Sequence, residues 1–293
     1  MFSVVSFLIT LRETIEAALI VGILLVYVIK IEQRKLRKDI WIGTAIGIIV
    51  SIGAAFAFNY LLGGFEQYEE IIEGFSMIFA AILLSWMIVW MRRTGRDIQE
   101  KLESKIEKSI RSQQRLGIIS LAFISVFREG IETVIFLAGI ESSGEAPIAI
   151  LWSGLFGIVI AVIIALLIFL SGKRINLKIF FNITSIILLI FAAGMLAHGI
   201  HELQELGWFG SENHFFQQVV WDTSGVLNDK TNELGLFLRA LFGYQDKPTW
   251  LELITYVGYY LVLSAVLVTF SRLNKRKKSK TKVIVEETQI PSS

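Results

Sequence analysis

Long runs of apolar residues, separated by short charged stretches, are the dominant pattern along this chain. Seven windows are long enough to cross about 30 Å of hydrocarbon, given a rise of 1.5 Å per residue of helix. These windows lie at residues 4–29, 41–62, 70–91, 116–140, 147–171, 179–203 and 250–271. The pattern therefore predicts an all-α polytopic membrane protein with seven transmembrane helices.

Basic residues follow the first, third, fifth and seventh windows. Acidic residues prevail in the connections that follow the second, fourth and sixth windows. The four basic segments lie at residues 30–38, 92–115, 173–178 and 272–282. Loops rich in lysine and arginine stay in the cytoplasm. All four segments therefore indicate one topology, with the N-terminus outside and the C-terminus in the cytoplasm. This topology suits a multi-pass protein of the cytoplasmic membrane.

The first six windows form two groups of three that would run in opposite directions. We expect repeat one to span residues 1–91 and repeat two residues 116–203, with the seventh helix appended. The second helix of each group carries a similar short sequence, Trp41-Ile-Gly43 and Trp152-Ser-Gly154. The pattern predicts an inverted 3+3 repeat, an architecture in which transporters hold the substrate near the membrane midplane.

The remaining segments complete the expected domain organisation. Residues 1–271 are predicted to form one transmembrane permease domain, which includes an outer segment at 204–249 and the seventh helix at 250–271. The outer segment mixes aromatic and polar residues, is too polar to span, and is expected to form short amphipathic helices at the interface. Residues 272–293 form a polybasic cytoplasmic tail, which we expect to be disordered and to attract anionic membrane lipid.

Composition narrows the classes of function. Of the 293 residues, 54% are hydrophobic and the mean hydropathy is +0.63, which is too apolar for a soluble domain of this length. The net charge of +2 gives no indication of nucleic-acid binding. The chain contains no cysteine, so thiolate metal sites are excluded and any metal must be held by oxygen or imidazole ligands.

The first and fourth windows each contain the same charged pentapeptide. One copy is Arg12-Glu13-Thr14-Ile15-Glu16, and the other is Arg128-Glu129-Gly130-Ile131-Glu132. An ionised side chain at this depth costs roughly 3 kcal/mol on insertion scales, so two copies in one pattern indicate a function. Positions three and four residues apart share one face of a helix. Two antiparallel helices would bring both motifs to one depth in the membrane.

The pentapeptides together supply carboxylates and guanidinium groups to one site. The predicted metal ligands are Glu13, Glu16, Glu129 and Glu132. Arg12 and Arg128 would orient these carboxylates and offset their mutual repulsion when no cation is bound. The alternative is a structural Arg–Glu pair in each helix, but each motif provides two carboxylates where one arginine needs one.

The sixth window ends in a cluster of ionisable residues near the expected outer surface. His198, His201, Glu202 and Glu205 are spaced three and four residues apart, so several of them can share a helix face. Such a face could bind a metal on entry or act as a pH-sensitive gate. The alternative is an ordinary polar end of a helix at the membrane interface.

With these motifs in place, the chain resembles the oxidase-dependent iron transporter family, which includes fungal high-affinity iron permeases and bacterial EfeU-like permeases. The resemblance covers about residues 1–271 and rests on the motifs at 12–16 and 128–132; residues 201–205 also resemble the end of the sixth helix in EfeU-like members. It implies import of iron with the motif glutamates as ligands, and no intrinsic cofactor. It also implies an extracytoplasmic cupredoxin-like or lipoprotein component and a haem peroxidase or oxidase as partners.

Other functions remain compatible with the same residues. One is a proton-coupled transporter of another heavy or divalent metal, such as lead or manganese; another is a membrane sensor that binds a metal without moving it. An enzyme is the least favoured class, because the sequence has no nucleophile–base arrangement or cofactor loop. The sequence leaves open the iron oxidation state, the energy coupling, and whether the chain forms a homo-oligomer.

Overall fold

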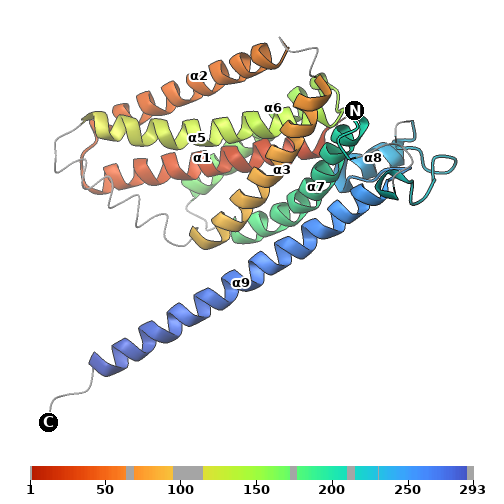
Figure 1. The fold of residues 1–293 in the computed structure, drawn as a ribbon. Coiled ribbons are helices and arrows are strands. Elements are labelled where there is room, and N and C mark those ends of the chain that lie inside the picture. Colours follow the sequence, from red (N-terminus) through yellow and green to blue (C-terminus); the bar gives the residue numbers. More distant parts are fainter. Residues whose placement is uncertain are drawn as a thin grey trace.

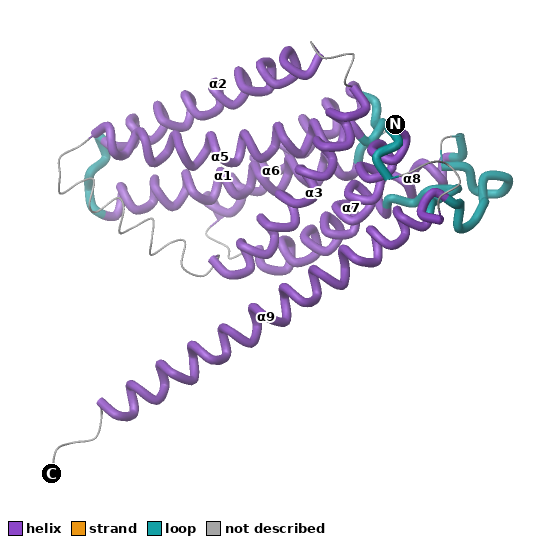
Figure 2. The backbone as a smooth tube through the Cα atoms, in the orientation of Figure 1, coloured by secondary structure: helices purple, strands orange, loops and turns teal. Residues whose placement is uncertain are grey.

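The computed structural model describes residues 2–63, 69–94, 115–171, 177–209, 215–229 and 231–288. Long helices account for most of these residues, as Figure 1 and Figure 2 show. The helices are α1 (Val4–Lys30), α2 (Leu36–Gly63), α3 (Glu69–Thr94), α5 (Arg115–Ser142), α6 (Pro147–Ser171), α7 (Leu177–Glu205), η2 (Phe215–Gln217), α8 (Glu233–Phe242) and α9 (Trp250–Thr288). The basic connections at 95–114 and 172–176 lie outside the described residues.

Five of these helices are long and apolar enough to cross a membrane: α2, α3, α6, α7 and α9. The sequence pattern predicts seven spans, and the two other long helices are α1 and α5. They have 27 and 28 residues, but each carries the three ionisable side chains of its motif. The all-helical, polytopic membrane architecture is therefore confirmed, and the motif charges set α1 and α5 apart from the apolar helices.

The long helices pack in a crossed arrangement. α1 lies between α5 and α6, α2 packs on α5, and α3 packs on α7 and α5. Figure 1 shows α2 at the edge of the bundle and α9 running along α7. Apolar side chains of the peripheral helices face outward, including Phe56 of α2 (74% exposed) and Trp152 of α6 (66% exposed). Exposure of this kind suits contact with lipid.

Glycines allow the two motif helices to approach their neighbours closely. A Cβ at Gly43 of α2 would lie 2.3 Å from the carbonyl oxygen of Ile119 in α5. A Cβ at Gly157 of α6 would lie 2.2 Å from Oγ1 of Thr10 in α1. Small residues at helix contacts let backbones approach in membranes, where helices have no hydrophobic drive to associate. These two contacts fix α1 and α5 within the bundle.

The outer segment is less helical than its composition predicts. Among its described residues, α8 is the one α-helix, and η2 is a single 3₁₀ turn. Asn232 caps α8 by accepting hydrogen bonds from the backbone N–H groups of Leu234 and Gly235, and Gly243 ends the helix with φ of 66°. Because glycine adopts this left-handed conformation without strain, the chain turns sharply there. Figure 1 shows α8 at the end of the bundle where the N-terminus lies.

The C-terminal segment differs from the expectation of disorder. α9 continues as one helix from Trp250 to Thr288, so the boundary placed at residue 271 is not a break in structure. The chain has neither glycine nor proline between residues 259 and 290, and lysine and arginine are good helix formers. Residues 289–293 lie outside the described part of the chain.

The close contact at Gly43 gives a test of the packing. We expect Gly43→Ala to lower the free energy of unfolding by about 1–3 kcal/mol, because its Cβ meets the backbone of α5. The matched control is Gly53→Ala on the same helix, where a Cβ would have nothing within 4 Å. Thermal unfolding in detergent measures both variants. An equal melting temperature for the two would contradict the contact.

Candidate metal centre

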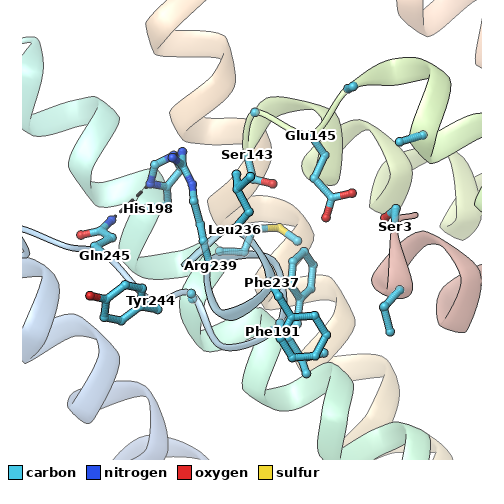
Figure 3. A pocket seen from close by; sticks show the side chains of 18 of the residues that line it. Ser3, Ser143, Glu145, Phe191, His198, Leu236, Phe237, Arg239, Tyr244 and Gln245 are labelled. Carbon is cyan, nitrogen blue, oxygen red and sulfur yellow. Dashed lines mark hydrogen bonds between the residues drawn. The ribbon is translucent and has the colours of Figure 1, made fainter. Parts of the chain in front are cut away.

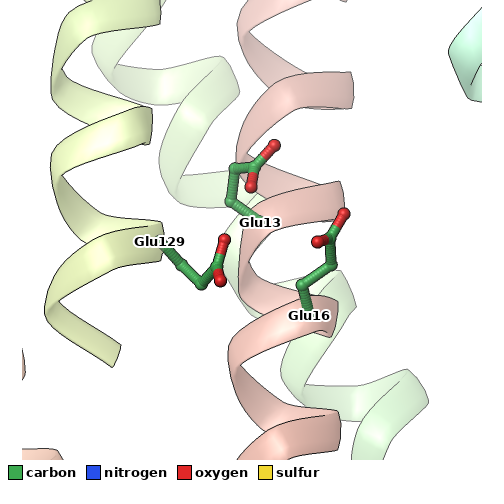
Figure 4. A group of neighbouring side chains, drawn as sticks. All are labelled: Glu13, Glu16 and Glu129. Carbon is green, nitrogen blue, oxygen red and sulfur yellow. The ribbon is translucent and has the colours of Figure 1, made fainter. Parts of the chain in front are cut away.

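Carboxylates from two helices meet in the interior of the bundle. Glu13 and Glu16 project from α1, and Glu129 projects from α5, as Figure 4 shows. One oxygen from each of the three lies within 4.8 Å of the others. Two come from one helix because residues three apart share a face, and the third arrives because α1 and α5 pack together. This separation is short enough for one cation to contact all three with small side-chain movements.

The first glutamate of each motif is the most deeply buried. Glu13 is 1% exposed and Glu129 is 4% exposed. Within the described part of the chain, both oxygens of Glu13 and one oxygen of Glu129 are buried without a hydrogen-bond partner. A buried charge without a partner is costly, so this pair needs a cation or a proton to offset its repulsion.

The second glutamate of each motif pairs with the arginine of its own motif. Arg12 Nε lies 3.0 Å from Glu16 Oε1, and Arg128 Nε lies 2.8 Å from Glu132 Oε1. Both are i, i+4 pairs, as the spacing predicts. Among the described residues, each motif therefore has one carboxylate in an ion pair with its arginine and one carboxylate outside such a pair.

The structure brings together three of the four predicted ligands. Glu132 is outside the group of three and keeps one oxygen on Arg128, while its other oxygen has no hydrogen-bond partner within the described residues. Its side chain is 14% exposed, similar to Glu16 at 13%. The predicted fourth ligand therefore lies outside the group of three in this structure.

A glycine inside the second motif matters for its position. A Cβ at Gly130 would lie 2.1 Å from Ser51 Oγ of α2, so a larger residue there would push α2 and α5 apart. The first motif has Thr14 at the equivalent place. The difference between the two motifs thus follows from the close packing of α2 on α5.

Two residues that belong to no sequence motif contact the motif arginines. Arg12 Nη2 donates to Met91 Sδ at 3.0 Å, and the guanidinium carbon of Arg128 lies 4.6 Å from the centre of the Trp90 ring. Both residues lie near the C-terminal end of α3. Methionine and tryptophan are common in any apolar helix, so only the three-dimensional arrangement identifies them.

The predicted outer cluster is engaged in contacts between helices. His198 Nε2 lies 3.2 Å from Nη2 of Arg239 in α8, and its Nδ1 lies 3.2 Å from the amide of Gln245. Arginine can only donate, so Nε2 of His198 accepts in the contact with Arg239. Glu202 lies 3.6 Å from the same ring. His198 thus joins α7 to α8 and the residues after it.

His201 joins α7 to the start of α9. Its Nδ1 lies 2.5 Å from Glu252, which is 2% exposed, and its Nε2 lies 3.3 Å from Glu205. Glu252 also accepts a hydrogen bond from the backbone N–H of Thr249, which completes a capping box at the start of α9. Among the described residues, the outer cluster contributes no member to a group of three with metal-binding geometry. A metal or gating role for it stays a prediction.

A cavity of about 550 Å³ lies beside this outer cluster. Figure 3 shows His198, Arg239 and Glu145 around it, with Phe191 and Phe237 forming apolar walls. Glu145 lies in the connection between α5 and α6, and burial raises its pKa. A hydrogen bond with Ser3 acts in the opposite direction. The cavity is therefore mostly apolar, with a few ionisable groups at its rim.

These features define a class of protein: a polytopic membrane protein with a carboxylate centre buried between two helices. The model of the iron permease FTR1 family matches residues 3–281, and the chain belongs to this family. It is 33% identical over 273 residues to the ferrous iron permease EfeU of Escherichia coli O6:H1, covering 91% of this chain and 94% of the relative. It is 32% identical over 268 residues to the same-named protein of Yersinia pseudotuberculosis, covering 89% and 91%.

The family membership confirms the resemblance seen in the two pentapeptides. It also places the chain among transporters rather than enzymes. No solved structure matches the chain. The geometry of the carboxylate centre is therefore argued from this chain's own residues.

The His201–Glu252 contact gives a second test. We expect His201→Ala to lower the free energy of unfolding by about 1–3 kcal/mol, because it leaves the Glu252 carboxylate buried with fewer partners. The matched control is Glu205→Ala, since this side chain is 57% exposed. Thermal unfolding in detergent again provides the measurement. If both variants unfold at the same temperature, the contact does not hold α9 in place.

Proposed function

We propose that this chain is a permease that imports iron across the cytoplasmic membrane by alternating access. The cation is held by the predicted ligands Glu13, Glu16, Glu129 and Glu132, and Arg12 and Arg128 orient these ligands. The observation that carries the proposal is the pair of open, buried carboxylates of Glu13 and Glu129, contributed by different helices. Membership in the iron permease family supports iron as the cargo.

The charge of the centre suits a multivalent cation. When every group is ionised, the motifs carry four carboxylates and two guanidinium groups, so a divalent cation restores neutrality. Carboxylate oxygens suit hard and borderline cations, and the cysteine-free chain has no thiolate to offer. Two relatives are named ferrous iron permeases, which supports testing the ferrous ion first.

We further propose seven spans, with the N-terminus outside, and an inverted 3+3 repeat. The packing supports it, because α1 packs on α6 as α5 packs on α2. A Cβ at Gly157 would meet the carbonyl oxygen of Phe7, and one at Gly47 would meet that of Phe123. Each phenylalanine precedes the first glutamate of its motif by six residues. The two halves therefore make the same contact at the same register.

In this proposal the oxidation chemistry lies with other proteins. The family resemblance implies an extracytoplasmic cupredoxin-like or lipoprotein component and a haem peroxidase or oxidase. The basic end of α9 would lie in the cytoplasm, near anionic lipid headgroups. The proposed chain itself contributes the route through the membrane and the carboxylates along it.

The proposal predicts the effect of removing the open carboxylates. Glu13→Ala and Glu129→Ala should each reduce iron uptake at least about tenfold, because a cation loses one of its few ligands in a dry site. The measurement is radioactive iron uptake into sealed vesicles that contain the protein alone. Glu141→Ala, an exposed carboxylate on the same helix as Glu129, is the control that should retain uptake.

The same vesicles separate the competing functions. Ferrous and ferric iron are supplied in parallel, and manganese and lead are added as competitors. Uptake of iron that the other metals fail to inhibit supports the proposal. Unchanged uptake in Glu13→Ala or Glu129→Ala would reject the site, and binding without net uptake would indicate a sensor.

A further inference from the structure

The two motif arginines, which belong to different helices, converge on adjacent residues of a third helix. Arg12 of α1 contacts Met91, and Arg128 of α5 contacts Trp90. Adjacent residues on a helix point about 100° apart, so one end of α3 can reach both neighbours. α3 also packs directly on α5. These contacts are separate from the arginine–glutamate pairs within each motif.

Each guanidinium is held at two points. Arg12 is 0% exposed; it directs Nε toward Glu16 and Nη2 toward the sulfur of Met91. Arg128 directs Nε toward Glu132 and lays its guanidinium over the ring of Trp90. In both motifs the second glutamate binds one part of the guanidinium, and the side chain from α3 holds another.

This arrangement decides which carboxylates stay open. A guanidinium close to an unpaired carboxylate in a low-dielectric interior is strongly attracted to it. Arg12 interacts electrostatically with Glu13, and Arg128, whose side chain is 42% exposed, interacts with Glu129. Among the described residues, each arginine nevertheless forms its ion pair with the second glutamate, at 3.0 Å in the first motif and 2.8 Å in the second. The contacts from α3 oppose a swing of the guanidinium onto the first glutamates.

We infer that Trp90 and Met91 are positioning residues of the carboxylate centre. They hold the motif arginines on the second glutamates, which keeps Glu13 and Glu129 open to the cation. They also keep a favourable contact for each guanidinium when a second glutamate turns toward the ion. This inference rests on the proposed function and assigns part of the affinity for the ion to α3.

The test compares two substitutions on α3 with two controls on the same helix. Trp90→Leu and Met91→Leu should each raise the apparent KM for ferrous iron about threefold to tenfold, the range expected for losing one such contact. Vmax per folded protein should stay near that of the unchanged chain, because the glutamates remain. Trp90→Phe keeps an aromatic face for Arg128, so its KM for ferrous iron should stay closer to that of the unchanged chain than the KM of Trp90→Leu.

The controls lie about one helical turn earlier. Trp86→Leu removes an indole that is 68% exposed, and Met87→Leu changes a thioether that is 3% exposed in the core. Both control variants should keep the KM of the unchanged chain. If losing any tryptophan or methionine from α3 raised the KM, the control variants would show the same rise as Trp90→Leu and Met91→Leu. An unchanged KM in Trp90→Leu or Met91→Leu, or an equal rise in the controls, would overturn the inference.

The outcome separates this inference from the proposed function. If the unchanged chain takes up no iron, the proposed function fails. If Glu13→Ala abolishes uptake while Trp90→Leu and Met91→Leu keep the normal KM, only the role of α3 fails. Because KM does not depend on the amount of folded protein, poor expression of a variant leaves the comparison valid.

Discussion

A carboxylate buried away from water needs a partner, and this requirement shapes the centre of the protein. Glu13 and Glu129 lie in the interior with open oxygens, at a depth where an unpaired charge is costly. The two arginines offset part of this cost through Glu16 and Glu132. They leave one carboxylate per motif unpaired. In the proposed function, a bound cation would offset the remaining cost.

The need to bring two such helices together explains the packing around them. Like charges on α1 and α5 oppose close approach, so other contacts must hold these helices side by side. The glycines of α2 and α6 provide them, because Gly43 lies on the backbone of α5 and Gly157 on that of α1. Each motif helix is thus anchored by a helix of the other proposed half whose apolar stretch, residues 41–62 in α2 and 147–171 in α6, carries no charged residue. Close backbone packing replaces the hydrophobic effect, which is weak between helices in lipid.

The sequence was sufficient for features that depend on local spacing. The long helices and both i, i+4 arginine–glutamate pairs follow from apolar runs and helix periodicity. The sequence alone does not predict which residues from distant segments come into contact. His201 meets Glu252 from 51 positions away, and the pairing gives the outer histidines a structural role that their spacing does not reveal. The apolar pattern ends near residue 271, so it does not predict that α9 continues to Thr288, although lysine and arginine favour helix.

The two ends of the bundle differ in how firmly they are held, and this bears on alternating access. At the end near α8, His198 and His201 connect α7 to α8 and α9 through side-chain hydrogen bonds. Near the C-terminal end of α3, the contacts with α1 and α5 run through Met91 and Trp90 to the arginines of the site itself. In the proposed function, a cation that draws Glu16 or Glu132 away from its arginine would therefore change the contacts of α3 directly. The helix best placed to respond to binding is α3, because its contacts and those of the ion share the same guanidinium groups.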